Sequence, residues 1–180
     1  MTPNSVIYTY MDSPLGKILI ARNSRGLYRI EFQEGLSPIV PETSWHFEQG
    51  GFEEALSQLR AYFRGELFHF DLPLAPEGTP FQLQVWGALR TIPYGEVISY
   101  AELASKIGRS QKAARAVGAA NGKNPLPIVI PCHRIIGSNG SLTGYAGGIQ
   151  LKEALLALER RGRANNNLQQ TFTEFQTDLI

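Results

Sequence analysis

The sequence contains a single cysteine, Cys132, and only three histidines among its 180 residues. One cysteine cannot form an internal disulfide bond, and such sparse use is typical of a reducing compartment. It cannot build a cysteine-based zinc site either, and the three histidines, His46, His69 and His133, are too scattered to suggest another metal centre. We therefore expect no disulfide and no metal ion.

Long apolar runs are also missing. No stretch approaches the ~18 consecutive apolar residues that a membrane-spanning helix needs. The first ten residues lack the basic segment followed by an apolar run that marks a secretory signal. We expect a monomeric cytoplasmic protein, associated with the nucleoid if the source is prokaryotic, with no membrane partner.

The net charge of +1 conceals an uneven distribution. Residues 1–80 have a balance of −4, residues 81–163 of +7, and residues 164–180 of −2. A basic segment beside an acidic one indicates a module that binds a polyanion, joined to a second unit.

The first part of the chain predicts a small α/β unit. Apolar residues alternate with a period of two in three short segments, which predicts an antiparallel meander of strands at 6–10, 17–22 and 27–32. After a predicted loop, an apolar stripe at helical spacing predicts a helix at 52–63, and a further strand is expected at 67–72. Prolines and a glycine predict a linker over 73–80, so residues 1–72 would form one domain without catalytic features.

Residues 81–163 predict a second, mainly helical domain. Ser99 and Glu102 have the spacing of a capping box, and Ser110 offers another cap before a helix over 111–120. Two short helices joined by a glycine-containing turn match the helix-turn-helix pattern. A last helix is expected at 149–161. In the polar tail, 164–180, apolar residues recur at helical spacing and suggest a short docked helix: Leu168, Phe172, Phe175 and Leu179.

The second helix of the predicted pair is unusually smooth. It consists almost entirely of alanine, valine and glycine, with Lys112 and Arg115 as its only charges. Small side chains would let it approach the narrow minor groove of DNA, but an alanine-rich helix can also simply pack well against the protein. The composition of this helix leaves both interpretations open.

Cys132 follows an apolar run and stands in the sequence Pro131-Cys132-His133-Arg134. A neighbouring base or positive charge produces the reactive thiolate, so this context favours a nucleophile. Taken by composition alone, a lone cysteine is more often a small buried apolar residue. Adjacent side chains on a strand point to opposite faces, so Cys132 and His133 could not contact each other directly in extended backbone. Either the chain turns at Pro131–Cys132, or a water joins the two side chains.

Glu159 and a glycine-rich loop follow this motif in the sequence and could contribute to the same site. Glu159 lies near the edge of the apolar face of the last helix, where it could be an exposed charge or could reach inward to orient His133. The glycine-rich loop over 137–148 lacks the Gly-Lys-Ser/Thr of a phosphate-binding loop, and we interpret it as a pocket wall.

Four motifs in order resemble the O6-alkylguanine-DNA alkyltransferases, also called methylated-DNA–protein-cysteine methyltransferases. The resemblance is strong from about residue 81 to 162. It implies a ribonuclease H-like N-terminal α/β domain, with an antiparallel sheet and a helix, and a C-terminal helix-turn-helix (winged-helix-like) domain. The motifs are Tyr94-Gly95-Glu96-Val97-Ile98-Ser99-Tyr100, Arg115-Ala116-Val117-Gly118, Pro131-Cys132-His133-Arg134 and Gly144-Tyr145-Ala146-Gly147-Gly148.

The resemblance implies direct transfer of an alkyl group from O6 of guanine, with O4-alkylthymine as a further candidate substrate. Cys132 would accept the group after activation by His133 and Glu159 through a water. Tyr100 would donate a proton toward the guanine, and Asn124 would organise the turn. Arg115 would fill the gap left by the base flipped out of double-stranded DNA, on the minor-groove side.

The resemblance also assigns a pocket and a set of DNA contacts. The expected pocket and backbone-contact residues are Ser138, Tyr145, Ala146, Gly147, Gln82, Ala101 and Ser110. Ala146 departs from the serine of many family members, which removes one potential hydrogen bond to the base. No nucleotide or methyl-donor site is visible, so we expect no cofactor, and a thioether on Cys132 would not be reversed by thiol exchange.

Three other interpretations compete with this one. An alkyltransferase-like binding protein would lack the cysteine, which is present here. A helix-turn-helix regulator would need polar base-reading residues on its second helix, and residues 113–120 have almost none. A cysteine hydrolase would need an oxyanion-hole pattern that the sequence does not show.

Overall fold

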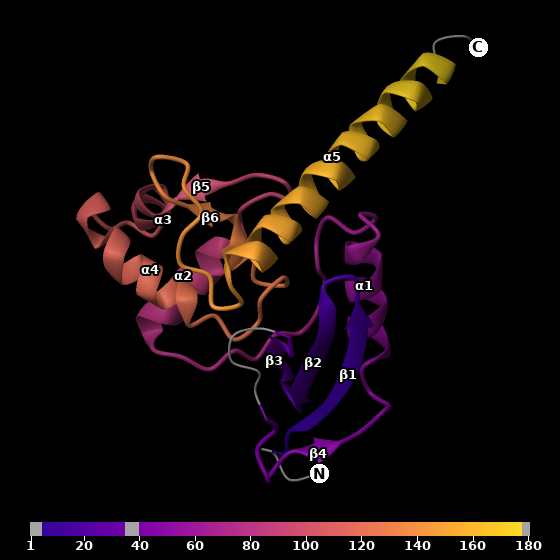
Figure 1. Ribbon diagram of the computed structural model, residues 1–180, viewed down its shortest axis with the longest axis vertical. Coiled ribbons are helices and arrows are strands. Elements are labelled where there is room, and N and C mark those ends of the chain that lie inside the picture. Colours follow the sequence, from indigo (N-terminus) through magenta and orange to yellow (C-terminus); the bar gives the residue numbers. More distant parts are fainter. Residues whose placement is uncertain (1–4, 35–39, 178–180) are drawn as a thin grey trace.

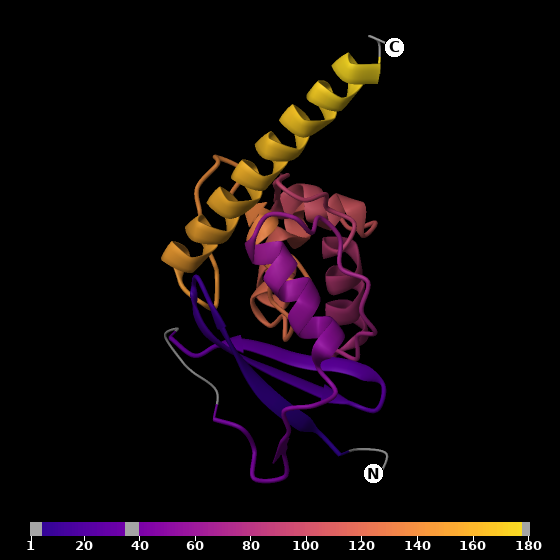
Figure 2. The ribbon, with the colours of Figure 1, turned by 90° about the vertical axis from the view of Figure 1, so that its right-hand side faces the viewer.

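The computed structural model describes the backbone of residues 5–34 and 40–177, and side chains as far as residue 168 (Figure 1). A sheet near the N-terminus forms one layer, and the helical remainder of the chain lies against it (Figure 2). Although α5, Ile149–Thr177, is 29 residues long, no helix in the described ranges carries the apolar stretch that crossing a membrane requires.

The predicted antiparallel meander is confirmed, with longer strands. It consists of β1 (Ile7–Ser13), β2 (Gly16–Asn23) and β3 (Gly26–Phe32). The predicted loop that follows contributes a two-residue strand, β4 (His46–Phe47), parallel to β1, so the order is β3-β2-β1-β4. Ile18, Leu19, Ile20 and Ala21 are all fully buried, because both faces of β2 are covered.

The predicted helix is confirmed as α1 (Glu53–Phe63), which buries Leu59 and Tyr62. The predicted strand at 67–72 is wrong. The Gln58 side chain bonds both backbone groups of Asp71, at 2.9 Å each, so that backbone is satisfied without a strand partner. Pairing occurs instead at Pro73 and Ala75, which bond Leu27 of β3 at 2.8 and 2.7 Å.

Capping chemistry sets the starts of the helices in the second part. Helix α2 (Pro80–Leu89) and helix α3 (Tyr100–Lys106) both begin with capping boxes, and the one at Ser99 and Glu102 is the predicted one. The predicted helix over 111–120 is divided into a 3-10 turn, η1 (Gln111–Ala113), and helix α4 (Ala114–Gly122). A short parallel pair, β5 (Ile98–Ser99) and β6 (Ile135–Ile136), lies beside α3.

Helix α5 is longer than the sequence pattern predicts. It runs past residue 161 without a break and projects away from the body (Figures 1 and 2). Gly162 lies within the helix where it packs against Tyr94, and a Cβ at that position would lie only 2.5 Å from the Tyr94 hydroxyl. Leu168 is 59% exposed, so it does not dock on the body. The side chains of Phe172 and Phe175, and all of Leu179, lie outside the described residues.

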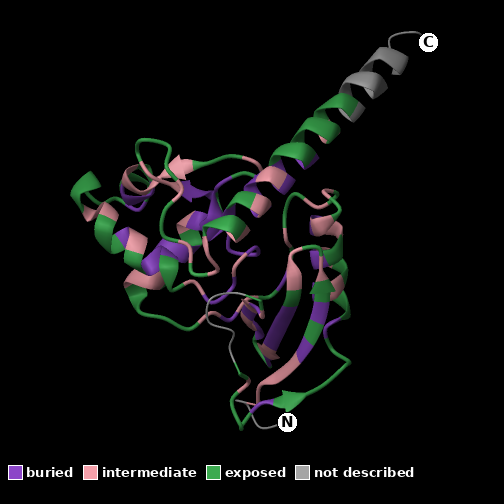
Figure 3. Cartoon of the chain, in the orientation of Figure 1, coloured by how far each residue is buried: buried purple, intermediate pink, exposed green. Residues whose placement is uncertain are grey.

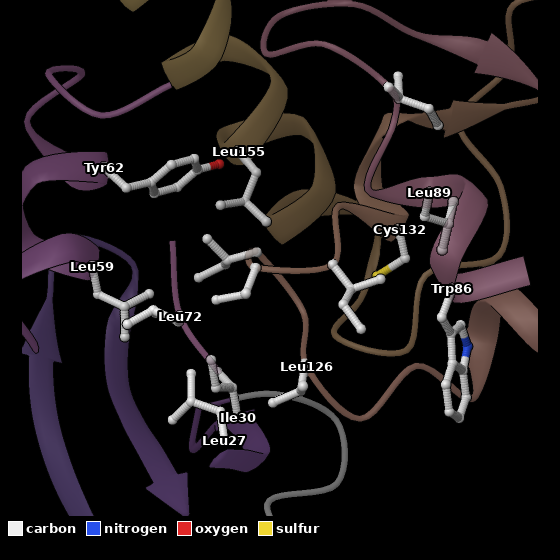
Figure 4. Close-up of a cluster of buried hydrophobic side chains, with 14 of the residues drawn as sticks. Leu27, Ile30, Leu59, Tyr62, Leu72, Trp86, Leu89, Leu126, Cys132 and Leu155 are labelled. Carbon is white, nitrogen blue, oxygen red and sulfur yellow. The ribbon is translucent and has the colours of Figure 1, made fainter. Parts of the chain in front are cut away.

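One apolar core joins the two parts of the chain (Figures 3 and 4). Ile30 and Leu59 from the first part pack in it with Leu126, Cys132 and Leu155 from the second. Because the core is continuous, the domain limits at residues 72 and 81 stay a prediction.

Candidate active site

Cys132 begins a 3-10 turn, η2 (Cys132–Arg134), which confirms the predicted departure from a strand after Pro131. The turn follows strained backbone, because Ile128 has φ of +75°. Two asparagine side chains hold it: Asn124 Nδ2 donates to the Ile130 carbonyl at 2.8 Å, and Asn121 Nδ2 donates to the Cys132 carbonyl at 3.3 Å.

Glu159 could have been an exposed charge or could have pointed inward to orient His133. Its side chain reaches into the protein from α5, so the inward alternative is correct. It is 0% exposed, as is His133. Its carboxylate accepts five hydrogen bonds, from His133 Nε2 at 2.7 Å, from Arg134 Nε, Arg134 Nη2 and Tyr62 Oη at 2.9 Å, and from the Gly95 amide at 2.9 Å. Both oxygens are therefore fully used.

The electrostatics fix the protonation states of this network. Burial alone would raise the pKa of Glu159, but the hydrogen bonds from His133 and Arg134, together with the Arg134 charge, outweigh it and hold that pKa well below its usual range. Burial, with smaller contributions from the Arg134 and Lys152 charges, lowers the pKa of His133 despite the opposing effect of Glu159. His133 is therefore a neutral imidazole near pH 7.

The tautomer of His133 follows from its partner. Because the ionised Glu159 only accepts hydrogen bonds, the ring proton must lie on Nε2, and Nδ1 carries the lone pair. Nδ1 is buried and has no hydrogen-bond partner among the described residues. The ring thus offers an unprotonated nitrogen in the residue next to the thiol.

The thiol itself is not ionised at rest. Burial raises the pKa of Cys132 to about 11, although a hydrogen bond from Asn124 and the charge of Lys152 act in the opposite direction. A thiol with such a pKa needs a base to react at neutral pH, and the next residue in η2 is the neutral His133.

Cys132 opens onto a small cavity walled by the glycine-rich loop. Three of the predicted residues, Tyr145, Ala146 and Gly147, line this cavity together with Cys132 and Asn124. Glu31 and Phe32 of β3 also line it. Their place in the cavity wall could not be predicted, since the meander has no catalytic motif.

Tyr100 lies at the start of α3 and points toward the same loop. Its hydroxyl donates to the Thr143 carbonyl at 3.0 Å. Glycines allow this approach, because a Cβ on Gly144 would lie 3.0 Å from the hydroxyl and one on Gly118 would lie 3.4 Å from the ring.

The other predicted residues lie apart from the cavity. Arg115 is exposed on α4, and Ser138 is exposed on the glycine-rich loop. Gln82 accepts a capping bond from the Thr79 amide at 2.8 Å, and Ser110 caps η1. Ala101 is half-buried in the first turn of α3.

Tyr62, Asn121 and Lys152 are buried site residues that the sequence reasoning missed. The position of Tyr62 in an apolar helical stripe suggested only packing.

No group of three or more histidine, cysteine, aspartate or glutamate side chains within the described ranges could hold a metal ion.

Comparison with known proteins identifies the family. Residues 80–161 match the profile described as "6-O-methylguanine DNA methyltransferase, DNA binding domain" and residues 6–76 match its "ribonuclease-like domain". The methylated-DNA–protein-cysteine methyltransferase of Methanosarcina acetivorans is 53% identical over 152 residues, which cover 84% of this chain and 97% of that protein. This chain belongs to the 6-O-methylguanine DNA methyltransferase family.

The methyltransferase of Mycobacterium tuberculosis is 50% identical, over 85% of this chain and 92% of that protein. The crystal structure of M. tuberculosis OGT in complex with DNA superposes with a TM-score of 0.80 at 49% identity, over 87% of this chain and 94% of that one. The predicted fold class, an α/β N-terminal sheet domain with a helical C-terminal domain, is confirmed. The part of α5 after residue 161 lies outside both matched ranges.

Replacing the buried carboxylate by an amide, Glu159→Gln, should destabilise the fold by about 3–5 kcal/mol, because it leaves the Arg134 charge buried without its partner. Chemical denaturation at pH 7 measures this. Glu153→Gln, on an exposed position of the same helix, should change stability by less than about 0.5 kcal/mol.

The buried ion pair of Glu159 and Arg134 also makes the stability of the protein depend on pH. Because folding lowers the pKa of Glu159, its contribution is present at neutral pH and is lost as the pH falls below about 5. Wild type should lose stability there more steeply than Glu159→Gln. Parallel curves for the two proteins would contradict the network.

Proposed function

We propose that this protein repairs DNA by transferring an alkyl group directly from O6 of guanine to Cys132. The observation that carries the proposal is the presence of a buried Cys132 thiol and a buried His133 in one 3-10 turn, with Nε2 of His133 bonded to Glu159 and Nδ1 left without a partner among the described residues. The names of the relatives, methylated-DNA–protein-cysteine methyltransferases, support the same reaction.

The chemistry follows from the protonation states. The Cys132 proton passes to His133 Nδ1 through one water, and the carboxylate of Glu159 stabilises the imidazolium. The thiolate attacks the alkyl carbon, a carbon–sulfur bond forms and the bond between that carbon and O6 breaks. The electron pair of the broken bond goes to guanine, which takes a proton from Tyr100. The Tyr100 phenolate is then reprotonated, and the His133 imidazolium deprotonated, through solvent. Overall, one proton passes from the thiol side to guanine, and the alkyl group ends on sulfur.

The reaction ends in a modified protein. A thioether is stable to thiol exchange, and the sequence contains no second cysteine to accept the group. The alkyl group comes from the substrate itself, so no cofactor takes part. Each molecule should act once, as a monomer.

DNA is the partner that we propose for the 81–163 unit, through its minor groove. Arg115 is exposed on α4 beside alanine and glycine positions, so the helix surface around it is shallow. It would occupy the space of the flipped base. The flipped base would be held by Ser138, Tyr145, Ala146 and Gly147. The phosphates would be contacted at the N-terminal ends of α2, α3 and η1, where Gln82, Ala101 and Ser110 lie.

The presence of Ala146 in the cavity wall bears on specificity. Without a hydroxyl there, the flipped base makes one hydrogen bond fewer. The pocket should therefore discriminate less sharply between O6-alkylguanine and O4-alkylthymine than a pocket with serine at that position.

Incubation with an oligonucleotide that carries O6-methylguanine tests the reaction directly. Intact mass spectrometry should show one methyl group per protein, located on Cys132, in at most stoichiometric amount. Cys132→Ala should bind the oligonucleotide and gain no mass. Multiple turnover, or binding by wild type without a mass gain, would rule out the proposal.

If Arg115 fills the gap left by the flipped base, its removal should lower the rate of repair on duplex DNA but not the rate of reaction with a free base. Arg115→Ala should slow repair of duplex DNA about tenfold or more, since extruding a base costs a few kcal/mol, and should leave reaction with free O6-benzylguanine nearly unchanged. Lys112→Ala, the other charge of this segment, is the matched control and should affect duplex repair less. Equal losses on both substrates for Arg115→Ala would argue against the role.

A further inference from the structure

Lys152 is a buried charge that the proposed reaction does not use. It projects from the first turn of α5 and is 0% exposed. Its ammonium donates to two carbonyls, those of Ile135 in β6 and, at 2.8 Å, of Thr143 in the glycine-rich loop. A buried lysine is costly unless it is bonded, so these two contacts tie the loop to the strand that follows Cys132.

The Thr143 carbonyl has a second donor, the Tyr100 hydroxyl at 3.0 Å. Tyr100 and Lys152 therefore converge on one oxygen from two different helices. Thr143 immediately precedes Gly144, and Gly144 to Gly147 line the cavity at Cys132. The position of this carbonyl thus sets the position of the cavity wall.

The two donors have different fates in the proposed reaction. Tyr100 must turn its hydroxyl from Thr143 to the guanine, which removes one of the two bonds that hold the loop. We propose that Lys152 is a positioning residue, which keeps the Thr143 carbonyl bonded and the cavity wall in place when the Tyr100 hydroxyl moves to the flipped base. This inference rests on the proposed function.

The charge of Lys152 is compatible with this role during the reaction. Burial lowers the pKa of Lys152, and a charge on Cys132 acts in the opposite direction. Formation of the Cys132 thiolate therefore strengthens the hold of Lys152 on its proton. The ammonium remains a donor at the moment when Tyr100 leaves.

A double-mutant cycle of Lys152→Met with Tyr100→Phe tests the proposal on the full-length protein. The measured quantities are the single-turnover rate at saturating O6-methylguanine duplex and the affinity for that duplex in a Cys132→Ala background. Lys152→Met alone should lower the rate about tenfold or more and change the affinity less than about threefold. In the Tyr100→Phe background the Tyr100 bond to Thr143 is absent throughout, so Lys152→Met should lower the rate by the same factor, about tenfold or more.

If the Tyr100 hydroxyl stayed on Thr143 during the reaction, it would hold the loop without Lys152, and the large loss of rate would occur in the Tyr100→Phe background alone; that result would overturn the proposal. A fall in duplex affinity as large as the fall in rate would show a general structural role and would also overturn it. If Lys152→Met does not fold, Lys152→Gln, which keeps a donor but loses the charge, enters the same cycle and should lower the rate by a smaller factor that is equal in both backgrounds. Lys17→Met, at an exposed position of β2, is the control and should leave the rate unchanged. Absence of transfer by wild type would instead overturn the proposed function.

Discussion

The structure depends on one buried carboxylate. Glu159 of α5 is completely enclosed and receives five hydrogen bonds from groups on three other segments. These segments are α1, the turn at Gly95, and η2, which contributes His133 and Arg134. A charge in that position is tolerated only because every acceptor site is used and Arg134 neutralises it. The same bonds that make the charge tolerable also orient His133, so folding and the proposed chemistry rest on one interaction.

This arrangement explains how the first part of the chain serves a site that lies in the second. Tyr62 of α1 bonds the carboxylate at 2.9 Å, while Glu31 and Phe32 of β3 line the cavity at Cys132. The continuous apolar core holds these groups at fixed positions. The N-terminal sheet is therefore a supporting wall of the site, although it carries no catalytic motif.

Much of the fold could be predicted because local rules govern it. Alternation predicted the meander, the Ser99–Glu102 spacing predicted a helix start, and the steric impossibility of direct pairing on a strand predicted the turn at Cys132. The strand at 67–72 was wrong because a side chain, Gln58, took the backbone bonds of Asp71. The long-range partners Tyr62 and Lys152 could not be predicted, since a tyrosine in an apolar stripe and a lysine on a helix have no local signature of burial.

Glu159 holds His133 as a neutral base with its ring proton on Nε2 and a lone pair on the buried Nδ1. Nitrogen-15 NMR of histidine-labelled protein at pH 7 tests this most directly, with the His133 signals assigned by their loss in His133→Gln. We expect a protonated Nε2 and an unprotonated Nδ1 for this ring. A proton on Nδ1, whether in the other neutral tautomer or in an imidazolium at rest, would contradict this assignment.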